Sequence, residues 1–463
     1  MKTLEDYLKK NAEMYADKVA VKCKEERLTY QQLYRAVVSR SIEIQKVQNA
    51  SSRQRGDVRM AQSRLIPFRA SQSIDFLIEY FAIHLAGCVA MPLEKDVPEE
   101  LFQEYQAMAE SAFAPSEKSD VAAAVSWPLD VADVLFTTGT TGKSKGVIVS
   151  HHAIIADAEN LVEAQGYHTD LTFLICGPLN HIGSLSKVYP IILVGGTLVI
   201  LEGMKDIKSF FESIERAEGK VATFLVPSSI NMLLALAEKQ LMEVSDKMEF
   251  IETGASAIPQ TTMRRLCHAL PHSRLYNTYA STETGIIATY DFGLGECLPG
   301  CLGKPMRHSS IEISENGKIV CGGDTLMSGY LGDDALTSTV LRKGKVHTQD
   351  LGLFDEQGRL RLQGRDGDVI NVGGFKVNPL EVEQAALSFP GISDCICVTF
   401  LHPVLGDALK LLYVTKEHGK FQLRSFVQCL KEKLEPYKLP QRYEEVERIE
   451  RTYNGKLNRK FYR

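Results

Sequence analysis

Between residues 147 and 300, short apolar runs alternate with longer segments of helical spacing, and this alternation constrains the fold more than any other feature. The apolar runs lie at 171–176, 197–201, 223–226 and 248–251. Strands that alternate with helices are typical of a parallel sheet that is buried on both faces. The chain is therefore predicted to be an α/β protein with mixed, mainly parallel sheets in a large N-terminal domain.

Three loops follow these strands and carry polar or small side chains. They lie at 176–181, 252–256 and 276–283. In open α/β sheets, ligands bind beyond the carboxyl ends of the strands, where such loops lie. We therefore expect the functional site at this edge of the sheet.

The composition is typical of a soluble metabolic enzyme with two or three domains. The chain has 463 residues, of which 44% are apolar and 24% are charged, so it has enough material for a large core and exceeds one ordinary domain. The formal net charge of -5 and the pI near 6.2 argue against a nucleic-acid partner, because that partner would require a basic surface.

Targeting and redox features point to the cytoplasm. The N-terminus is charged and lacks the apolar segment of a secretory signal. The most apolar run, 189–201, contains two glycines and is too short for a membrane span. The ten cysteines have no CxxC spacing and no histidine cluster at zinc spacing, so they are predicted to be reduced and mostly buried.

Residues 137–146 have the sequence TTGTTGKSKG, which combines hydroxyls, glycines and lysines. Glycines allow the backbone to turn its N–H groups inward, and the hydroxyls and lysines add donors and positive charge. This composition is typical of a loop that wraps phosphates, although it also occurs in polar turns. The residues assigned to phosphate binding are Thr137, Thr138, Gly139, Thr140, Thr141, Gly142 and Lys145.

A P-loop nucleotide triphosphatase is not favoured by this stretch. The Walker A motif requires a glycine five positions before its last glycine. If Gly142 were that last glycine, the first would stand at position 137, which is Thr137.

Further motifs in a fixed order make the pattern more specific. Together with the threonine-rich stretch, they resemble the signature of the adenylate-forming superfamily, which includes acyl-CoA and aryl-CoA ligases, luciferases and nonribosomal adenylation domains. The motifs are YASTE at 279–283, HTQD at 347–350, GR at 364–365 with Gly374 and PLEVE at 379–383, and NGK at 454–456. LTY at 28–30 and the AGxVxxP pattern at 86–92 also fit, so the resemblance covers essentially the whole chain.

The resemblance implies a division of the chain. Residues 1–363 would form the N-terminal adenylate-forming domain, with a β subdomain at about 300–363. Residues 364–368 would be a hinge, and 369–463 would form a small mobile α+β lid domain.

It also implies an AMP-forming acid-thiol ligase. Such an enzyme uses ATP and Mg²⁺ to convert a carboxylic acid into an acyl- or aryl-adenylate with release of pyrophosphate, and then forms a thioester with CoA. Two alternatives stay open at this stage. The acceptor could be the phosphopantetheine of an acyl carrier protein, or the chain could be a scaffold that binds nucleotide without catalysis.

By resemblance, five charged residues would act on the nucleotide and the acid. Lys456 would bridge the substrate carboxylate and the α-phosphate, Glu283 would place Mg²⁺ on the phosphates, and Lys145 would bind phosphate oxygens. Asp350 would accept hydrogen bonds from the ribose, with Arg365 nearby. Taken singly, each could be an ordinary turn or surface residue; their joint order favours the functional interpretation.

The remaining implied site residues complete the catalytic and nucleotide-binding sets. Thr282 belongs to both sets, and His181 would line and gate the acyl pocket. The adenine would be walled by Gly254, Ala255, Ser256, Asn277, Thr278 and Tyr279. Gly373 and Gly374 would reach the site when the lid rotates for the second step.

The chain departs from the family pattern at a few positions. Ala280 and Gln349 stand where glycine is usual, and Gly367 replaces the common Asp or Lys of the hinge. A glycine there would make the hinge more permissive. The segment between Pro92 and the threonine-rich loop is shorter than usual, which predicts a reduced N-terminal domain.

Overall fold

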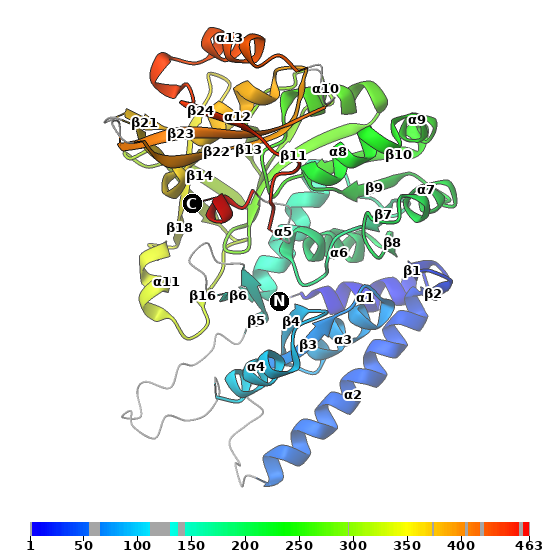
Figure 1. The fold of residues 1–463 in the computed structure, drawn as a ribbon. Coiled ribbons are helices and arrows are strands. Elements are labelled where there is room, and N and C mark those ends of the chain that lie inside the picture. Colours follow the sequence, from blue (N-terminus) through cyan, green and yellow to red (C-terminus); the bar gives the residue numbers. More distant parts are fainter. Residues whose placement is uncertain are drawn as a thin grey trace.

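The structure is a computed structural model (Figure 1). It describes residues 2–54, 65–111, 130–137, 144–294, 296–372, 375–402, 406–416, 421–452 and 457–462. Within these ranges, no helix combines the length and the apolar character needed to cross a bilayer.

The centre of the molecule is one 14-stranded sheet, in which six neighbouring strands are parallel. These strands are β11 (Arg274–Ser281), β10 (Met248–Thr253), β9 (Val221–Phe224), β7 (Thr172–Ile175), β8 (Thr197–Ile200) and β1 (Val19–Cys23). The helices between and after them are α5 (His151–Gln165), α6 (Ile182–Val194), α7 (Ile207–Glu215), α8 (Pro227–Leu236), α9 (Glu238–Glu243) and α10 (Gln260–Ala269). The alternation in the sequence therefore predicted the parallel part of the sheet correctly.

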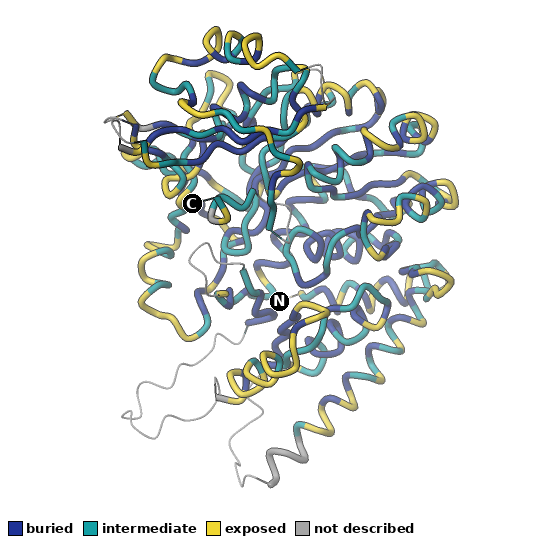
Figure 2. Tube along the Cα trace, in the orientation of Figure 1, coloured by how far each residue is buried: buried dark blue, intermediate teal, exposed yellow. Residues whose placement is uncertain are grey.

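Alternate residues of these strands enter two different cores. Phe173 and Phe250 pack on the face that α5 and α6 cover, whereas Leu174 and Ile251 pack on the face of α7, α8 and α10. Because both faces are covered, the strands are almost continuously apolar. Figure 2 shows the same arrangement, with buried residues along the strands and exposed residues on the outer helices.

The rest of the large sheet is antiparallel. It contains β2 (Glu26–Thr29), β12 (Gly285–Asp291), β13 (Cys301–Pro305), β14 (Ser309–Ile313), β15 (Lys318–Gly323), β17 (Leu341–Arg342), β18 (Lys345–Phe354) and β19 (Leu360–Arg365). The strands beyond residue 300 continue this sheet by hydrogen bonding, through the pairs β12–β13 and β13–β19. The short helix α11 (Asp334–Val340) lies beside them.

A second sheet carries the two ends of the threonine-rich stretch. Its five strands, in spatial order, are β16 (Gly329–Tyr330), β6 (Lys145–Ser150), β5 (Val131–Thr137), β4 (Val89–Glu94) and β3 (Leu65–Ala70). The associated helices are α1 (Leu4–Met14), α2 (Tyr30–Gln54), α3 (Ile74–Leu85) and α4 (Glu99–Ser111). Because β5 and β6 are antiparallel and Thr137 pairs with Lys145, the stretch connects two strands of one hairpin.

The C-terminal part has its own sheet and core, at the opposite end of the molecule from α1–α3 (Figure 1). Its elements are β20 (Ile370–Val372), β21 (Phe375–Val377), α12 (Pro379–Leu387), β22 (Ile392–His402), β23 (Gly406–Thr415), α13 (Leu423–Lys433) and β24 (Arg442–Glu445). Cys395 and Cys397 lie on the same face of β22 and are buried in one core of the C-terminal part, as predicted. All ten cysteines are free and most are buried.

Candidate active site

A cavity of about 1760 Å³ lies at the carboxyl ends of the parallel strands. Its wall is formed by the ends of β9, β10 and β11, the first turns of α6, and parts of β6, β18 and β19. It contains many of the residues that the sequence assigned to the site. These are Thr137, Lys145, His181, Gly254, Ala255, Thr278, Thr282, Glu283, Asp350 and Arg365.

Three predicted adenine contacts do not line this cavity. Thr278 and Ala280 of β11 line it, so the intervening Tyr279 and the preceding Asn277 lie on the other side of the strand. The Asn277 amide donates to the Cys301 carbonyl at 2.7 Å and is buried. Ser256 lies in the turn beyond the lining residue Ala255. The structure therefore places Asn277 and Tyr279 as supports of the wall.

Other predicted residues fall outside the described part of the chain. They are Thr138, Gly139, Thr140, Thr141, Gly142, Gly373, Gly374 and Lys456. Their assignments stay predictions.

Glu283 is presented by a turn that its neighbours fix. The Ser281 hydroxyl accepts from the Thr284 N–H at 3.2 Å, and the Thr284 hydroxyl accepts from the Ser281 N–H at 3.1 Å. Tyr330 donates its hydroxyl to Glu283 Oε1 at 2.9 Å. Burial and the Glu283 charge raise the pKa of Tyr330, so this tyrosine stays a donor.

Lys145 lies close to the same group. Its Nζ atom is 5.5 Å from the centroid of the Tyr330 ring. A cation and a carboxylate thus face the cavity around one aromatic ring. Tyr330 was not predicted from the sequence, where its signal is an aromatic residue between the turn glycines Gly329 and Gly332.

Asp350 is held from two sides. Tyr279 donates to its Oδ2 atom at 2.8 Å, and Arg365 Nε lies 3.3 Å from its Oδ1 atom. Asp350 and Arg365 are opposite each other in the β18–β19 register, which is why motifs 15 residues apart meet. An anchored carboxylate beside a guanidinium suits the recognition of vicinal hydroxyls with a phosphate nearby.

The loop after β10 approaches β11 closely. A Cβ atom on Gly254 would lie 3.0 Å from the Thr278 carbonyl oxygen, so a larger residue would push the loop away. The next residue, Ala255, has a φ of 66°, a left-handed conformation that costs a non-glycine residue energy. The tight turn therefore presents backbone, with little side-chain bulk, to the cavity.

His181 is the N-cap residue of α6 and lines the cavity. Its role at an acyl pocket stays a prediction. The loop before it is held by Gln72, whose amide donates to the Gly177 carbonyl at 2.9 Å and accepts from the Leu179 N–H at 3.2 Å. Gln72 was not predicted from the sequence, because it comes from a distant segment with no motif of its own.

A buried ion pair borders the same cavity. Lys187 Nζ lies 2.8 Å from Glu252 Oε1, and both side chains have an exposed fraction of 0%. Glu252 was predicted from the sequence to lie in a functional loop, but its pairing with Lys187 was not predicted. The available signal was a lysine within an otherwise apolar helical segment.

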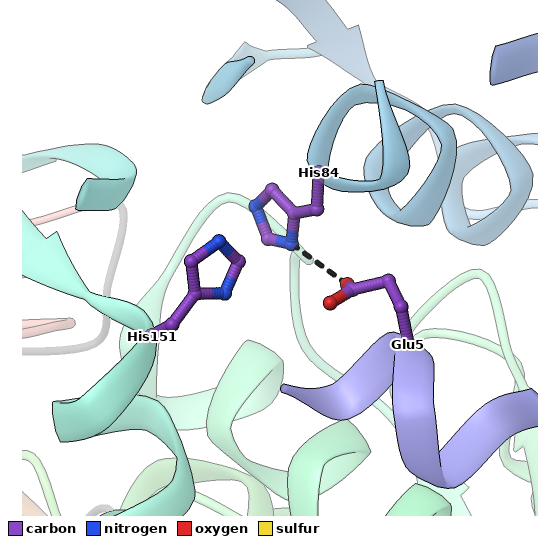
Figure 3. A group of neighbouring side chains, drawn as sticks. All are labelled: Glu5, His84 and His151. Atoms are coloured by element: carbon purple, nitrogen blue, oxygen red, sulfur yellow. Dashed lines mark hydrogen bonds and ion pairs between the residues drawn. The ribbon is translucent and has the colours of Figure 1, made fainter. Parts of the chain in front are cut away.

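A second buried ionic group lies near the base of the β5–β6 hairpin. Figure 3 shows His84 of α3 between Glu5 of α1 and His151 of α5, and their ligand-type atoms lie within 4.8 Å of one another. The two ring nitrogens of His84 are each 3.0 Å from a carboxylate oxygen, of Glu5 and of Asp133. A ring that donates from both nitrogens is an imidazolium, which has no lone pair for a metal ion.

Electrostatics agree with that charge state. Burial lowers the pKa of His84, but the charges and hydrogen bonds of Glu5 and Asp133 outweigh this effect and raise the pKa to about 10. Burial and the His84 charge lower the pKa of His151, so the second imidazole is neutral. The group is therefore one cation held between two carboxylates.

Two family models and several known proteins match large parts of this chain. The family model for the AMP-binding enzyme matches residues 101–331, and the model for the C-terminal domain of that enzyme matches 381–456. Indoleacetate–CoA ligase from Aromatoleum aromaticum is 28% identical over 340 residues, which are 70% of this chain and 65% of the relative. A 2-succinylbenzoate–CoA ligase from Staphylococcus aureus is 30% identical over 342 residues, which are 72% of this chain and 67% of the relative.

Solved structures share the fold. ATP-bound MatB from Rhodopseudomonas palustris has a TM-score of 0.83 and 21% identity, covering 100% of this chain and 99% of that one. The o-succinylbenzoate CoA synthetase MenE from Bacillus subtilis, in complex with the acyl-adenylate OSB-AMP, has a TM-score of 0.78 and 22% identity, covering 98% and 97%. These matches confirm the fold class predicted from the sequence.

Proposed function

This chain belongs to the AMP-binding enzyme family, and from that premise we propose that it is an AMP-forming acid-thiol ligase. It condenses a carboxylic acid with ATP to form an acyl- or aryl-adenylate and pyrophosphate, and then transfers the acyl group to CoA. The observation that carries the proposal is the convergence of Lys145, Glu283, Asp350 and Arg365 on one cavity.

The first step must bring two anions together. A carboxylate is a poor electrophile, and it becomes reactive only as a mixed anhydride with AMP. Its oxygen attacks the α-phosphorus and pyrophosphate leaves, so the site must neutralise the charge that develops there. Lys145 and Arg365 supply positive charge within the described part of the cavity wall, and Lys456 is proposed to supply more at the α-phosphate.

Glu283 fits a magnesium site. Mg²⁺ in nucleotide sites is usually bound by one or two carboxylates together with phosphate oxygens and water. Glu283 faces the cavity, and the Tyr330 hydroxyl holds one of its oxygens, which fixes the carboxylate without neutralising it. When bound, the ion would draw negative charge from the phosphates of ATP.

The nucleotide and the acid occupy different parts of the cavity in this proposal. Asp350 accepts hydrogen bonds from the ribose hydroxyls, and the adenine lies against the backbone of Gly254 and Ala255. The acid lies toward His181 and Val226, near α6 and the end of β9. The names of both curated relatives end in CoA ligase, which supports CoA as the acceptor.

The second step is proposed to use the C-terminal part as a mobile lid. Residues 364–368 are the proposed hinge between the domain of 1–363 and the lid of 369–463. In the structure, Asp366 of this hinge forms an ion pair with Lys318 of β15 at 2.7 Å. Rotation would break that pair, withdraw Lys456 and bring Gly373 and Gly374 to the thiol.

The experiment is acid-dependent exchange of labelled pyrophosphate into ATP, measured with a panel of aryl and aliphatic acids. We expect exchange with at least one acid, and a thioester when CoA is then added. No exchange with any acid would overturn the proposal. If exchange occurs but the acyl group is transferred only to a carrier-protein phosphopantetheine, the acceptor is the carrier protein and not CoA.

A further inference from the structure

The inner wall of the proposed acid pocket contains charge. Lys187 lies five residues along α6 from its first residue, Ile182, or roughly 7.5 Å deeper than the helix start at 1.5 Å per residue. Glu252 is on the same face of β10 as Phe250, which faces α6. The ion pair therefore borders the cavity well below the level of His181 and is closed to bulk water.

This ion pair has unused hydrogen-bonding capacity. Within the described ranges, no group donates to Glu252 Oε2. The Lys187 ammonium has three donors, of which one is used on Glu252. Its Nζ atom also lies 5.4 Å from the centre of the Phe224 ring, and its charge acts on the Asp157 carboxyl. A buried charged group with idle donors or acceptors is costly unless something else pairs with it.

The Phe224 ring packs beside this pair and against two glycines of the cavity wall. A Cβ atom on Gly183 would lie 3.3 Å from the Phe224 ring, and one on Gly254 would lie 3.5 Å from the same ring. The ring therefore lies over two glycines between α6 and β10. A ligand group that reaches Lys187 therefore also lies near an apolar ring.

The charges around Lys187 and Glu252 determine which functional group of a ligand can bind between them. Lys187 and Glu252 together are neutral, and Asp157 is also buried nearby, where burial raises its pKa to about 7. A second carboxylate on the ligand would add negative charge close to two acids, and an ammonium would be repelled by Lys187. A hydroxyl adds no charge and both accepts and donates one hydrogen bond.

We propose that the acid this enzyme activates carries a hydroxyl group remote from its carboxylate, which accepts a hydrogen bond from Lys187 and donates one to Glu252. The inference rests on the proposed function, because it assumes that the acid enters this part of the cavity. It makes Lys187 and Glu252 specificity-determining residues for that reaction.

The first test uses the wild-type enzyme and matched acids in the pyrophosphate exchange assay. The pairs are hydroxybenzoates with methylbenzoates, hydroxyphenylacetates with methylphenylacetates, and 6-hydroxyhexanoate with heptanoate. A site that pairs with a substrate hydroxyl rejects the analogue that lacks it, so we expect at least about a hundredfold higher kcat/KM for one hydroxyl acid than for its methyl partner. The methoxy analogue, which accepts but does not donate, should lose most of this advantage.

The second test removes the pair as a unit. Lys187→Met combined with Glu252→Leu leaves no orphaned charge, and this variant should use the hydroxyl and methyl acids equally. The matched control is Lys208→Met with Glu212→Leu, an exposed pair on α7 at 3.5 Å, which should keep the wild-type preference.

The outcomes separate the two proposals. Exchange that is equal for hydroxyl and methyl acids in the wild type would overturn this inference and make the pair purely structural, while the ligase function stands. A preference that survives in the Lys187→Met, Glu252→Leu variant would also overturn it. No exchange with any acid would overturn the ligase function and this inference with it.

Discussion

The group around His84 and the pair formed by Lys187 and Glu252 are both buried ionic clusters, but only the first is saturated. Each ring nitrogen of His84 meets a carboxylate oxygen at 3.0 Å, from Glu5 and Asp133. The Tyr80 hydroxyl donates to Asp133 Oδ2 at 2.9 Å.

In the second cluster, which includes Lys187, Glu252 and the nearby Asp157, the hydrogen bonding is incomplete. Lys187 and Glu252 share one hydrogen bond, and the Glu252 Oε2 atom has no partner in the described ranges. Asp157 accepts from the Ile286 N–H at 2.7 Å through Oδ1, but its Oδ2 atom is likewise unpaired there.

This difference distinguishes buried charges that stabilise the fold from buried charges that can bind a ligand. In a low-dielectric interior, a fully paired network stabilises one arrangement of the chain, whereas a partly paired one is costly. The saturated cluster joins α1 and α3 to Asp133 of β5, the strand that leads into the threonine-rich loop, so it fixes the base of the site. The unsaturated cluster borders the cavity, and we propose that a ligand completes it.

The largest effect should come from breaking the saturated cluster. His84→Leu leaves the carboxylates of Glu5 and Asp133 buried without their cation, and removal of one partner from a buried ionic group typically costs about 3–5 kcal/mol. We expect a loss of that size in the free energy of unfolding, measured by denaturant titration.

A matched histidine gives the control. His168 also pairs with a carboxylate, Glu249 at 2.9 Å, but its side chain is 43% exposed. His168→Leu should cost less than about 1 kcal/mol, as exposed ion pairs do. Similar losses for both substitutions would contradict the structural role given to the first cluster.

The next effect concerns rate and leaves stability unchanged. Lys456→Ala should slow adenylate formation about a hundredfold, which corresponds to roughly 3 kcal/mol of barrier, because the charge at the α-phosphate loses one partner. Thioester formation from preformed acyl-adenylate should be largely retained, and the free energy of unfolding should not change.

Single-turnover measurements of the two steps check this prediction, with Lys431→Ala on the exposed face of α13 as the control. Equal losses in both steps would remove the role assigned to Lys456. A large loss of stability would place Lys456 with His84 as a structural residue.

The saturated cluster should also make stability depend on pH. The pKa of His84 rises from an ordinary 6.5 to about 10 in the folded protein, so between these values the folded state holds one proton more than the unfolded state. The contribution is complete below pH 6.5 and falls by up to about 1.4 kcal/mol per pH unit as the pH rises toward 10. The free energy of unfolding of the wild type minus that of His84→Leu, measured from pH 6 to 10, isolates this slope. A difference that does not change with pH would show that His84 is neutral.

Part of the fold and part of the candidate site were predicted from the sequence. Buried parallel strands are nearly continuous apolar runs, so β7 to β10 were predicted from periodicity. The family resemblance, which the comparisons confirm, followed from the order of short motifs. It assigned Lys145, Glu283 and Asp350 to one site, and all three line one cavity.

The parts that were not predicted depend on register and on contacts between distant segments. The family resemblance assigned Asn277, Thr278 and Tyr279 to the adenine wall as one run, but alternate residues of β11 face opposite sides, and of the three Thr278 lines the cavity. The pair Lys187 and Glu252 joins residues 65 positions apart, and no local pattern encodes that separation. The chain departs from the family pattern at Ala280, Gln349 and Gly367, and these departures do not predict the pair of Lys187 and Glu252 either.

The smallest effect should come from replacing the unsaturated pair as a unit. Lys187→Met with Glu252→Leu exchanges a buried ion pair for apolar side chains, a change that is often neutral or stabilising. We expect the free energy of unfolding to fall by no more than about 1 kcal/mol or to rise, whereas Lys187→Met alone should cost more because it isolates the Glu252 carboxylate. Denaturant titration of both variants checks this. A loss as large as that of His84→Leu would mean that both clusters stabilise the fold equally, and that unpaired atoms beside this cavity do not distinguish a ligand site from a structural one.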